Sequence, residues 1–70
     1  MNLRIQQAFG KKLREVRNNQ ELTQEELADK AGLHFTYIGQ AERGLRNITL
    51  ESLYKLAKAL KVKSSELLPF

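Results

Sequence analysis

The sequence of 70 residues contains no cysteine, one histidine, one proline and four glycines. The absence of cysteine excludes disulfides, thiolate zinc sites and cysteine nucleophiles together. The single His34 cannot form a metal site by itself, and no cluster of a nucleophile, a base and an orienting residue is visible. We therefore expect no metal, no other cofactor and no enzymatic activity. One domain spanning residues 1–70 has to be stabilised by helix packing and self-association.

Long hydrophobic runs are also missing. No apolar segment approaches the roughly 20 residues that a membrane-spanning helix needs, and the N-terminus lacks the apolar block of a signal peptide. We therefore expect a cytoplasmic protein without a membrane partner. Hydrophobic residues make up 41% of the chain and charged residues 29%, which is typical of a folded domain rather than a disordered one.

The charge balance is basic, with 12 Lys and Arg residues against 8 Asp and Glu residues and a formal net charge of +4. The basic side chains concentrate in residues 1–20 and 44–70, whereas acidic side chains dominate residues 21–43. In a chain this small, the excess indicates a polyanionic partner. Charge alone does not distinguish such a partner from an ordinary solvated surface.

The spacing of apolar residues predicts five short helices. The first covers about residues 2–18, where Gly10 weakens one turn by about 1 kcal/mol relative to alanine. Thr49 caps the fourth helix, and a last short helix follows at about residues 64–68 and ends at Pro69. The inner face of the first helix consists of Ile5, Phe9, Leu13 and Val16, and that of the fourth of Leu50, Leu53, Leu56, Ala57 and Leu60.

The strongest local pattern lies in residues 23–44. Thr23 and Glu26 have the spacing of a capping box at the start of the second helix, and Gly32 is placed to end it. A third helix starts near His34 or Phe35 and stops at Gly44. Two short helices joined at a glycine are typical of a helix-turn-helix, although any helical hairpin can show this pattern.

A wider pattern consists of residues 9–14 (FGKKLR), 22–28 (LTQEELA), 31–33 (AGL), 37–38 (YI), 42–44 (ERG), 46–50 (RNITL), Leu53, 56–57 (LA) and 59–60 (AL). In this pattern the chain as a whole resembles the Cro/CI-type (Xre-like) helix-turn-helix family of regulators. The segment from Tyr37 to Asn47 is most similar to small single-domain regulators such as the controller proteins of restriction–modification systems. The resemblance implies an all-α, five-helix, lambda-repressor-like DNA-binding domain, with the helix-turn-helix at about residues 23–43.

The chain departs from the family pattern at four positions. Glu21 and Lys61 stand where many members have glycine, so two non-glycine residues are expected at helix ends. Lys63 stands where a serine often caps the fifth helix, which moves the expected cap to Ser64. Phe35 replaces an arginine that close relatives often carry, and this changes the expected base preference rather than the fold.

The helix-turn-helix geometry assigns base contacts to the outward residues of the third helix. Glutamine can pair with adenine, threonine offers a hydroxyl and a methyl group, and Phe35 can pack on a thymine methyl unless it is buried against the second helix. A glycine there allows close approach to the groove. The predicted base-contacting residues are Phe35, Thr36, Gly39 and Gln40.

Phosphate contacts are expected around these residues. Gln24 lies in the first turn of the second helix, where free N–H groups favour an anion, and the matching family residue binds phosphate and braces a recognition residue. Gln24 and Arg43 could also be simply solvated, and His34 could be only a helix cap. The predicted phosphate contacts are Gln24, His34, Arg43, Arg46 and Asn47. By resemblance, Arg17 and Glu42 form a structural salt bridge.

We expect a homodimer on a palindromic operator, because one helix in one half-site rarely gives useful affinity. Leu67, Leu68 and Phe70, with the neighbouring fourth helix, are the predicted dimer interface; alternatively, they close the core of the monomer. The partner is then double-stranded DNA, with no small-molecule ligand. An alternative is an antitoxin-type or other protein-interaction module of a toxin–antitoxin or restriction–modification system that also binds DNA.

Overall fold

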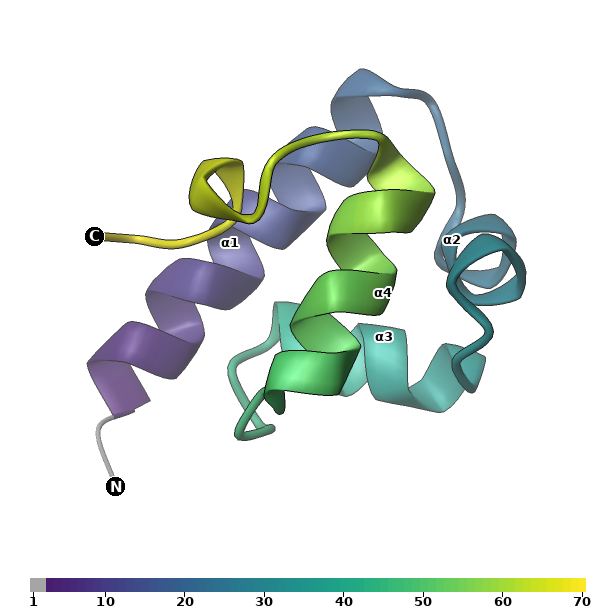
Figure 1. The fold of residues 1–70 in the computed structure, drawn as a ribbon. Coiled ribbons are helices and arrows are strands. Elements are labelled where there is room, and N and C mark those ends of the chain that lie inside the picture. The colour runs from purple at the N-terminus through teal and green to yellow at the C-terminus, as the bar shows by residue number, and fades with distance from the viewer. Residues whose placement is uncertain (1–2) are drawn as a thin grey trace.

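The structure, a computed structural model, describes residues 3–70 (Figure 1). These residues form four α-helices, one short 3-10 helix and no strand, which confirms the all-helical class. Within them, no helix is both long and apolar enough to span a bilayer. The elements are α1 (Leu3–Asn19), α2 (Gln24–Ala31), α3 (Phe35–Glu42), α4 (Leu50–Leu60) and the 3-10 helix η1 (Ser64–Glu66).

The helix ends follow the local sequence closely. The Thr23 hydroxyl accepts the Glu26 backbone N–H at 3.0 Å, and the Glu26 carboxylate accepts the Thr23 backbone N–H at 2.8 Å. Hydrogen bonding to the carboxylate, from the Thr23 backbone N–H first and from the Thr23 side chain second, lowers the pKa of the Glu26 carboxyl below its ordinary value. Gly32 ends α2 with φ 68°, and Thr49 caps α4 through the Ser52 N–H at 3.0 Å. The expected capping box and caps are confirmed.

The expectation of a fifth α-helix is wrong. After α4 the chain makes only the three-residue η1, and the residue that precedes it is Lys63, not Ser64. The Lys63 backbone N–H donates to the Glu66 carboxylate at 2.9 Å. The segment has to turn back within a few residues to bury Leu67, and Pro69 follows directly, so there is room only for the tighter 3-10 turn.

Glu21 and Lys61 both adopt left-handed backbone conformations, each with φ 57°. Each residue ends a helix in a conformation that costs a non-glycine residue roughly 1–2 kcal/mol. The two expected departures from glycine are therefore confirmed as places of backbone strain.

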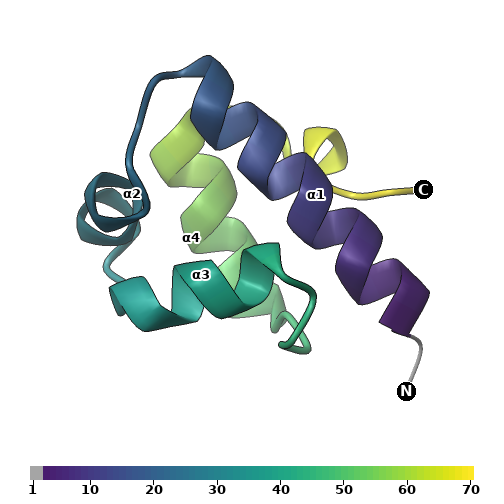
Figure 2. The ribbon, with the colours of Figure 1, turned by 180° about the vertical axis from the view of Figure 1, so that it is seen from behind.

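The core lies between the four α-helices, with α1 packed on α3 and with α2 packed on both α3 and α4. Figure 2 shows the C-terminal end of α3 beside α1 and its N-terminal end beside α2. Leu50 was expected to face inward but is 83% exposed. At 100° per residue it lies about 60° around the helix from Leu53, on the same side as Tyr54. The core residues are Phe9, Leu13, Leu27, Ala28, Ala31, Ile38, Ala41, Leu56, Ala57, Leu60 and Leu67.

Gly10 is the point at which α1 crosses the end of α3. A Cβ atom built on this glycine would lie 2.7 Å from the Glu42 backbone carbonyl carbon and would also meet the Ala41 carbonyl oxygen. Both groups belong to the backbone and cannot rotate away. The glycine that the sequence marked only as a weak helical turn thus permits the close packing of α1 on α3.

We predict that Gly10→Ala lowers the free energy of unfolding by about 2 kcal/mol, because the added methyl group overpacks the crossing. In an unobstructed helix, the same change stabilises by up to about 1 kcal/mol. Gly39→Ala is the matched control, since a Cβ there meets only the Gln24 side chain, at 3.4 Å. Urea unfolding followed by circular dichroism measures both variants. Equal stability changes for the two would contradict the close crossing.

Candidate nucleic-acid interface

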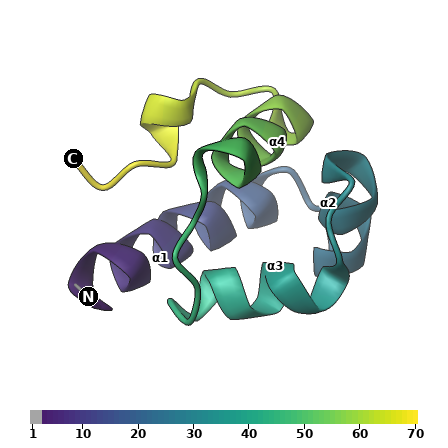
Figure 3. The same cartoon turned by 60° about the horizontal axis from the view of Figure 1, so that its bottom comes forward.

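The second helix of the helix-turn-helix lies at an edge of the molecule. Figure 3 shows α3 along one side, with α4 and the C-terminal segment on the opposite side. His34 is the residue before α3, and its Nδ1 atom accepts the Thr36 backbone N–H at 3.3 Å. The helix start near His34 or Phe35, and the capping role of His34, are therefore confirmed.

The outward side of α3 carries the four predicted base-contacting residues. Phe35 is 52% exposed, and its ring stacks on His34 with the ring centroids 5.8 Å apart. It is therefore not buried against α2. Thr36 is exposed, and Gly39 and Gln40 are half-buried. The four residues lie together on a surface that a nucleic acid can reach.

Arg17 and Glu42 form the expected salt bridge between the ends of α1 and α3. Arg17 Nε lies 2.5 Å from Glu42 Oε2, and a second guanidinium nitrogen lies 3.0 Å from Oε1. The side chains are only 11% and 3% exposed. This bidentate contact compensates the negative charge of Glu42, the one acidic residue of α3, which would otherwise repel phosphate.

A third helix, α2, contacts the same Glu42 carboxylate through Gln24. Its Nε2 atom donates to Glu42 Oε1 at 3.1 Å, and its carbonyl end lies near Gly39. The bracing role of Gln24 is therefore directed to Glu42 rather than to a base-contacting residue. Its contact with phosphate stays a prediction.

A polar cleft of about 370 Å³ runs beside α3 and joins these groups. Arg14 and Arg43 are exposed basic residues of its lining, whereas Arg17 is engaged by Glu42. With that pair internally neutral, the accessible charge of the cleft is positive. Its lining consists of Arg14, Arg17, Gln24, Phe35, Thr36, Gly39, Glu42 and Arg43.

The loop after α3 is tied to the helices by side-chain hydrogen bonds. Arg46 Nε donates to Gln40 Oε1 at 2.7 Å, and the guanidinium carbon lies 5.3 Å from the centre of the Tyr37 ring. Asn47 Oδ1 accepts a hydrogen bond from Gln6 Nε2 in α1. Arg46 and Asn47 are exposed, but each already has an intramolecular partner.

Three residues that line or support this surface were not assigned to it from the sequence. Tyr37 was considered as part of the family resemblance, Gln6 was not distinguished from its neighbours, and Arg14 fell only within the basic residues 1–20. The repeated basic residues at Arg14 and Arg17 could have indicated a cleft-lining side of α1. Nothing in the sequence pairs Gln6 with Asn47, which lies 41 residues away.

The predicted interface residues at the C-terminus differ in exposure. Leu67 is completely buried in the core of the monomer, whereas Leu68 is half-buried and Phe70 is 84% exposed. Leu67 therefore closes the core, which was the alternative for this segment. Leu68 and Phe70 still line the surface.

The fold and this surface define a helix-turn-helix domain with an exposed, braced second helix. A family model described as helix-turn-helix matches residues 13–67, and the chain belongs to this family. The resemblance to the Xre-like regulators and to the restriction–modification controller proteins is confirmed by the relatives described next.

The chain is similar to two control proteins of known sequence. It is 42% identical to control protein C.BamHI of Bacillus amyloliquefaciens, over 100% of this chain and 88% of that protein. It is 47% identical to control protein C.SmaI of Serratia marcescens, over 91% and 76% of the two chains. The crystal structure of the restriction–modification controller protein C.AhdI from Aeromonas hydrophila superposes with a TM-score of 0.86 at 46% identity, over 87% and 92% of the two chains.

We predict that Arg17→Met lowers the free energy of unfolding by about 3–5 kcal/mol, because it leaves the Glu42 carboxylate buried without its cation. The double variant Arg17→Met/Glu42→Leu should recover most of this loss. Glu51→Ala is the control, since it removes an exposed pair with Lys55 at 3.6 Å that contributes little. Chemical unfolding measures all three. A loss for Arg17→Met as small as that of the control would refute the buried pair's importance.

Proposed function

We propose that this protein is a sequence-specific DNA-binding transcriptional regulator that acts as a dimer on a palindromic operator. The observation that carries the proposal is the exposed side of α3, together with the buried hydrogen bonds that fix the position of this helix. Arg17, Gln24 and Glu42 bring α1, α2 and α3 to one point, so the reading helix is rigid before DNA arrives. A preformed helix of this kind suits the major groove of a duplex.

The chemistry of the outward side suits base edges. Phe35 offers an apolar ring for a thymine methyl group, and Thr36 offers a hydroxyl and a methyl group. Gly39 carries no side chain, so the backbone of α3 can approach the groove closely. Gln40 supplies the amide that reads a base at the other end of the surface.

Phosphate contacts would come from both ends of α3. At its start, the His34 Nδ1 atom accepts the Thr36 N–H, which leaves Nε2 as the donor atom of the ring. Gln24 retains one amide hydrogen, and Asn47 retains its NH₂ group, because its oxygen is the atom bonded to Gln6. Arg43 and Arg46 add positive charge after α3. Such contacts position the duplex without reading its sequence.

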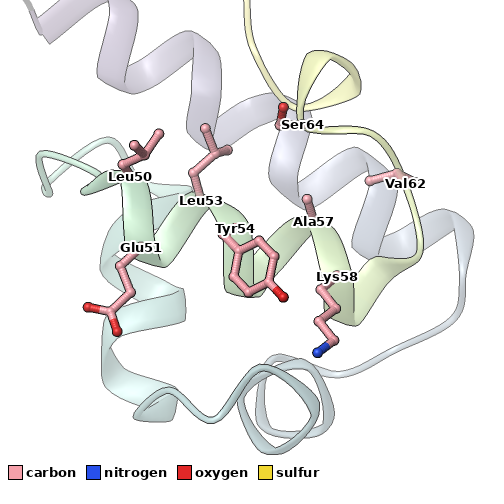
Figure 4. Close-up of a pocket in the computed structure, with 8 residues that line it drawn as sticks. All are labelled: Leu50, Glu51, Leu53, Tyr54, Ala57, Lys58, Val62 and Ser64. Atoms are coloured by element: carbon pink, nitrogen blue, oxygen red, sulfur yellow. The ribbon is translucent and has the colours of Figure 1, made fainter.

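The dimer would form through an apolar face on α4 and the C-terminus, defined by Leu50, Leu53, Tyr54, Leu68 and Phe70. Figure 4 shows the α4 part of this face, where Leu50, Leu53 and Tyr54 line a groove of about 770 Å³. A second groove of about 270 Å³ begins at the same two leucines and continues to Leu68 and Phe70. Large exposed apolar patches commonly mark protein interfaces.

A second copy of the chain is the occupant that best suits this face. The elements that carry this face, α4 and the C-terminal segment, lie on the opposite side of the molecule from α3 (Figure 3), so pairing through them would leave both reading helices uncovered. A twofold dimer reads a palindrome, with one half-site for each copy. We assign the protein no catalytic role and place its action in the cytoplasm, on double-stranded DNA. A toxin-like protein partner would compete for the same apolar face.

Selection of bound sequences from a random pool of duplex DNA tests the proposal directly. We expect a palindromic consensus. On that sequence, Arg43→Ala should weaken binding and lower the slope of log affinity against log salt by about one unit for each copy, because one phosphate contact is lost. Lys63→Ala removes the same charge far from α3 and should leave the slope unchanged. A pool without a consensus would refute sequence-specific binding.

Substitutions on the apolar face test the dimer. Leu50 and Phe70 are 83% and 84% exposed in the monomer, so Leu50→Lys/Phe70→Lys should preserve the fold. We expect the dimer dissociation constant to rise by about 30-fold or more, as for the loss of a central interface contact. Leu45→Lys is the matched control, since Leu45 is 63% exposed but lines neither groove. Sedimentation velocity measures the fraction of dimer for both variants. If both stay equally dimeric, the proposed interface is wrong.

A further inference from the structure

We propose that Arg46 is a specificity-determining positioning residue, which turns the amide of Gln40 so that its NH₂ group faces the DNA and reads a guanine. The inference rests on the proposed function and concerns the same surface. It revises two expectations from the sequence, namely that Gln40 pairs with adenine and that Arg46 serves only a phosphate.

The orientation of the Gln40 amide follows from the chemistry of its partner. Arginine has only N–H donors and no acceptor. Arg46 Nε, 2.7 Å away, can therefore bond only to the carbonyl end of the amide, Oε1. The NH₂ group of Gln40 then lies on the other branch of the planar amide, which is not the branch directed at Arg46.

Arg46 is itself held in place from a second side. Its guanidinium lies over the Tyr37 ring, with the central carbon 5.3 Å from the ring centre, which is within the distance of a cation–π contact. Tyr37 is half-buried in α3 and so provides a fixed platform. An exposed loop arginine that has both a stacking partner and a hydrogen-bonded partner is constrained toward one arrangement. Tyr37, Arg46 and Gln40 thus form a single unit on the edge of the reading helix.

The fixed amide changes which base is complementary. A glutamine that reads adenine accepts from N6 and donates to N7, so it needs both ends of its amide at the groove. With Oε1 directed toward Arg46 and one of its lone pairs engaged there, the NH₂ donors are the part of the amide that is free to turn to a base. Guanine presents two acceptors in the major groove, N7 and O6, whereas adenine presents its N6 donor beside N7. The unit therefore selects a G·C pair over an A·T pair.

The experiment first locates the base pair that Gln40 reads. The wild-type protein and Gln40→Ala are each selected against a random DNA pool, and the position whose preference changes is the one read by Gln40. Two operators that differ only there, with G·C or A·T, are then titrated by fluorescence anisotropy with the wild type, Arg46→Ala and Arg43→Ala. We expect the wild type to prefer G·C by about tenfold or more.

Arg46→Ala should reduce the preference to about twofold or less, because the amide becomes free to rotate toward adenine. Arg43→Ala, the matched control, should weaken both operators equally and keep the preference. In a Gln40→Ala background, removal of Arg46 should affect the two operators equally. This last result separates positioning of Gln40 from any contact that Arg46 makes with phosphate.

Three results would overturn the inference: a wild-type preference for A·T, an unchanged preference in Arg46→Ala, or no position that responds to Gln40→Ala. Each of these leaves the proposed function intact, provided that the wild type selects a consensus. If the wild type selects no consensus at all, the proposed function itself fails. The two failures are therefore distinguishable in the same set of measurements.

Discussion

The buried contact between Arg17 and Glu42 is the interaction on which the position of α3 and of its exposed side depends. It joins the last turns of α1 and α3, while Gln24 brings the first turn of α2 to the same carboxylate. Arg17 also donates to the Leu22 carbonyl at 2.7 Å, which fixes the chain between α1 and α2. Gly10 lets α1 approach α3 beside this point. The position of α3 is thus determined from behind, and its outward residues are not needed for the core.

Features determined by local sequence could be predicted well. The capping box at Thr23, the glycine that ends α2 and the cap at Thr49 depend on residues within one turn, so the sequence is sufficient for them. The fifth helix and the inward position of Leu50 were wrong for a common reason. Both depend on where the neighbouring segments lie in space. The spacing of apolar residues along one helix does not determine those positions.

The candidate surface shows the same division. Helical geometry was enough to place Phe35 and Thr36 on the outward side of the third helix, although it left burial of Phe35 against the second helix open. The family resemblance was enough to pair Arg17 with Glu42. The contacts from Arg46 to Gln40 and from Gln6 to Asn47 were out of reach, because they depend on the path of the loop after α3. That path determines which end of an amide is free, and therefore what each side chain can still bind.

The exposed apolar face on α4 also bears on how such a regulator responds to its own abundance. Under the proposed pairing, a monomer leaves Leu50 and Phe70 in water, and only association covers them. While monomers predominate, the amount of dimer grows with the square of the total chain concentration, by mass action. Operator occupancy then stays low during early synthesis and rises steeply past a threshold. A few exposed leucines and aromatics would in this way give a small chain a delayed, switch-like output.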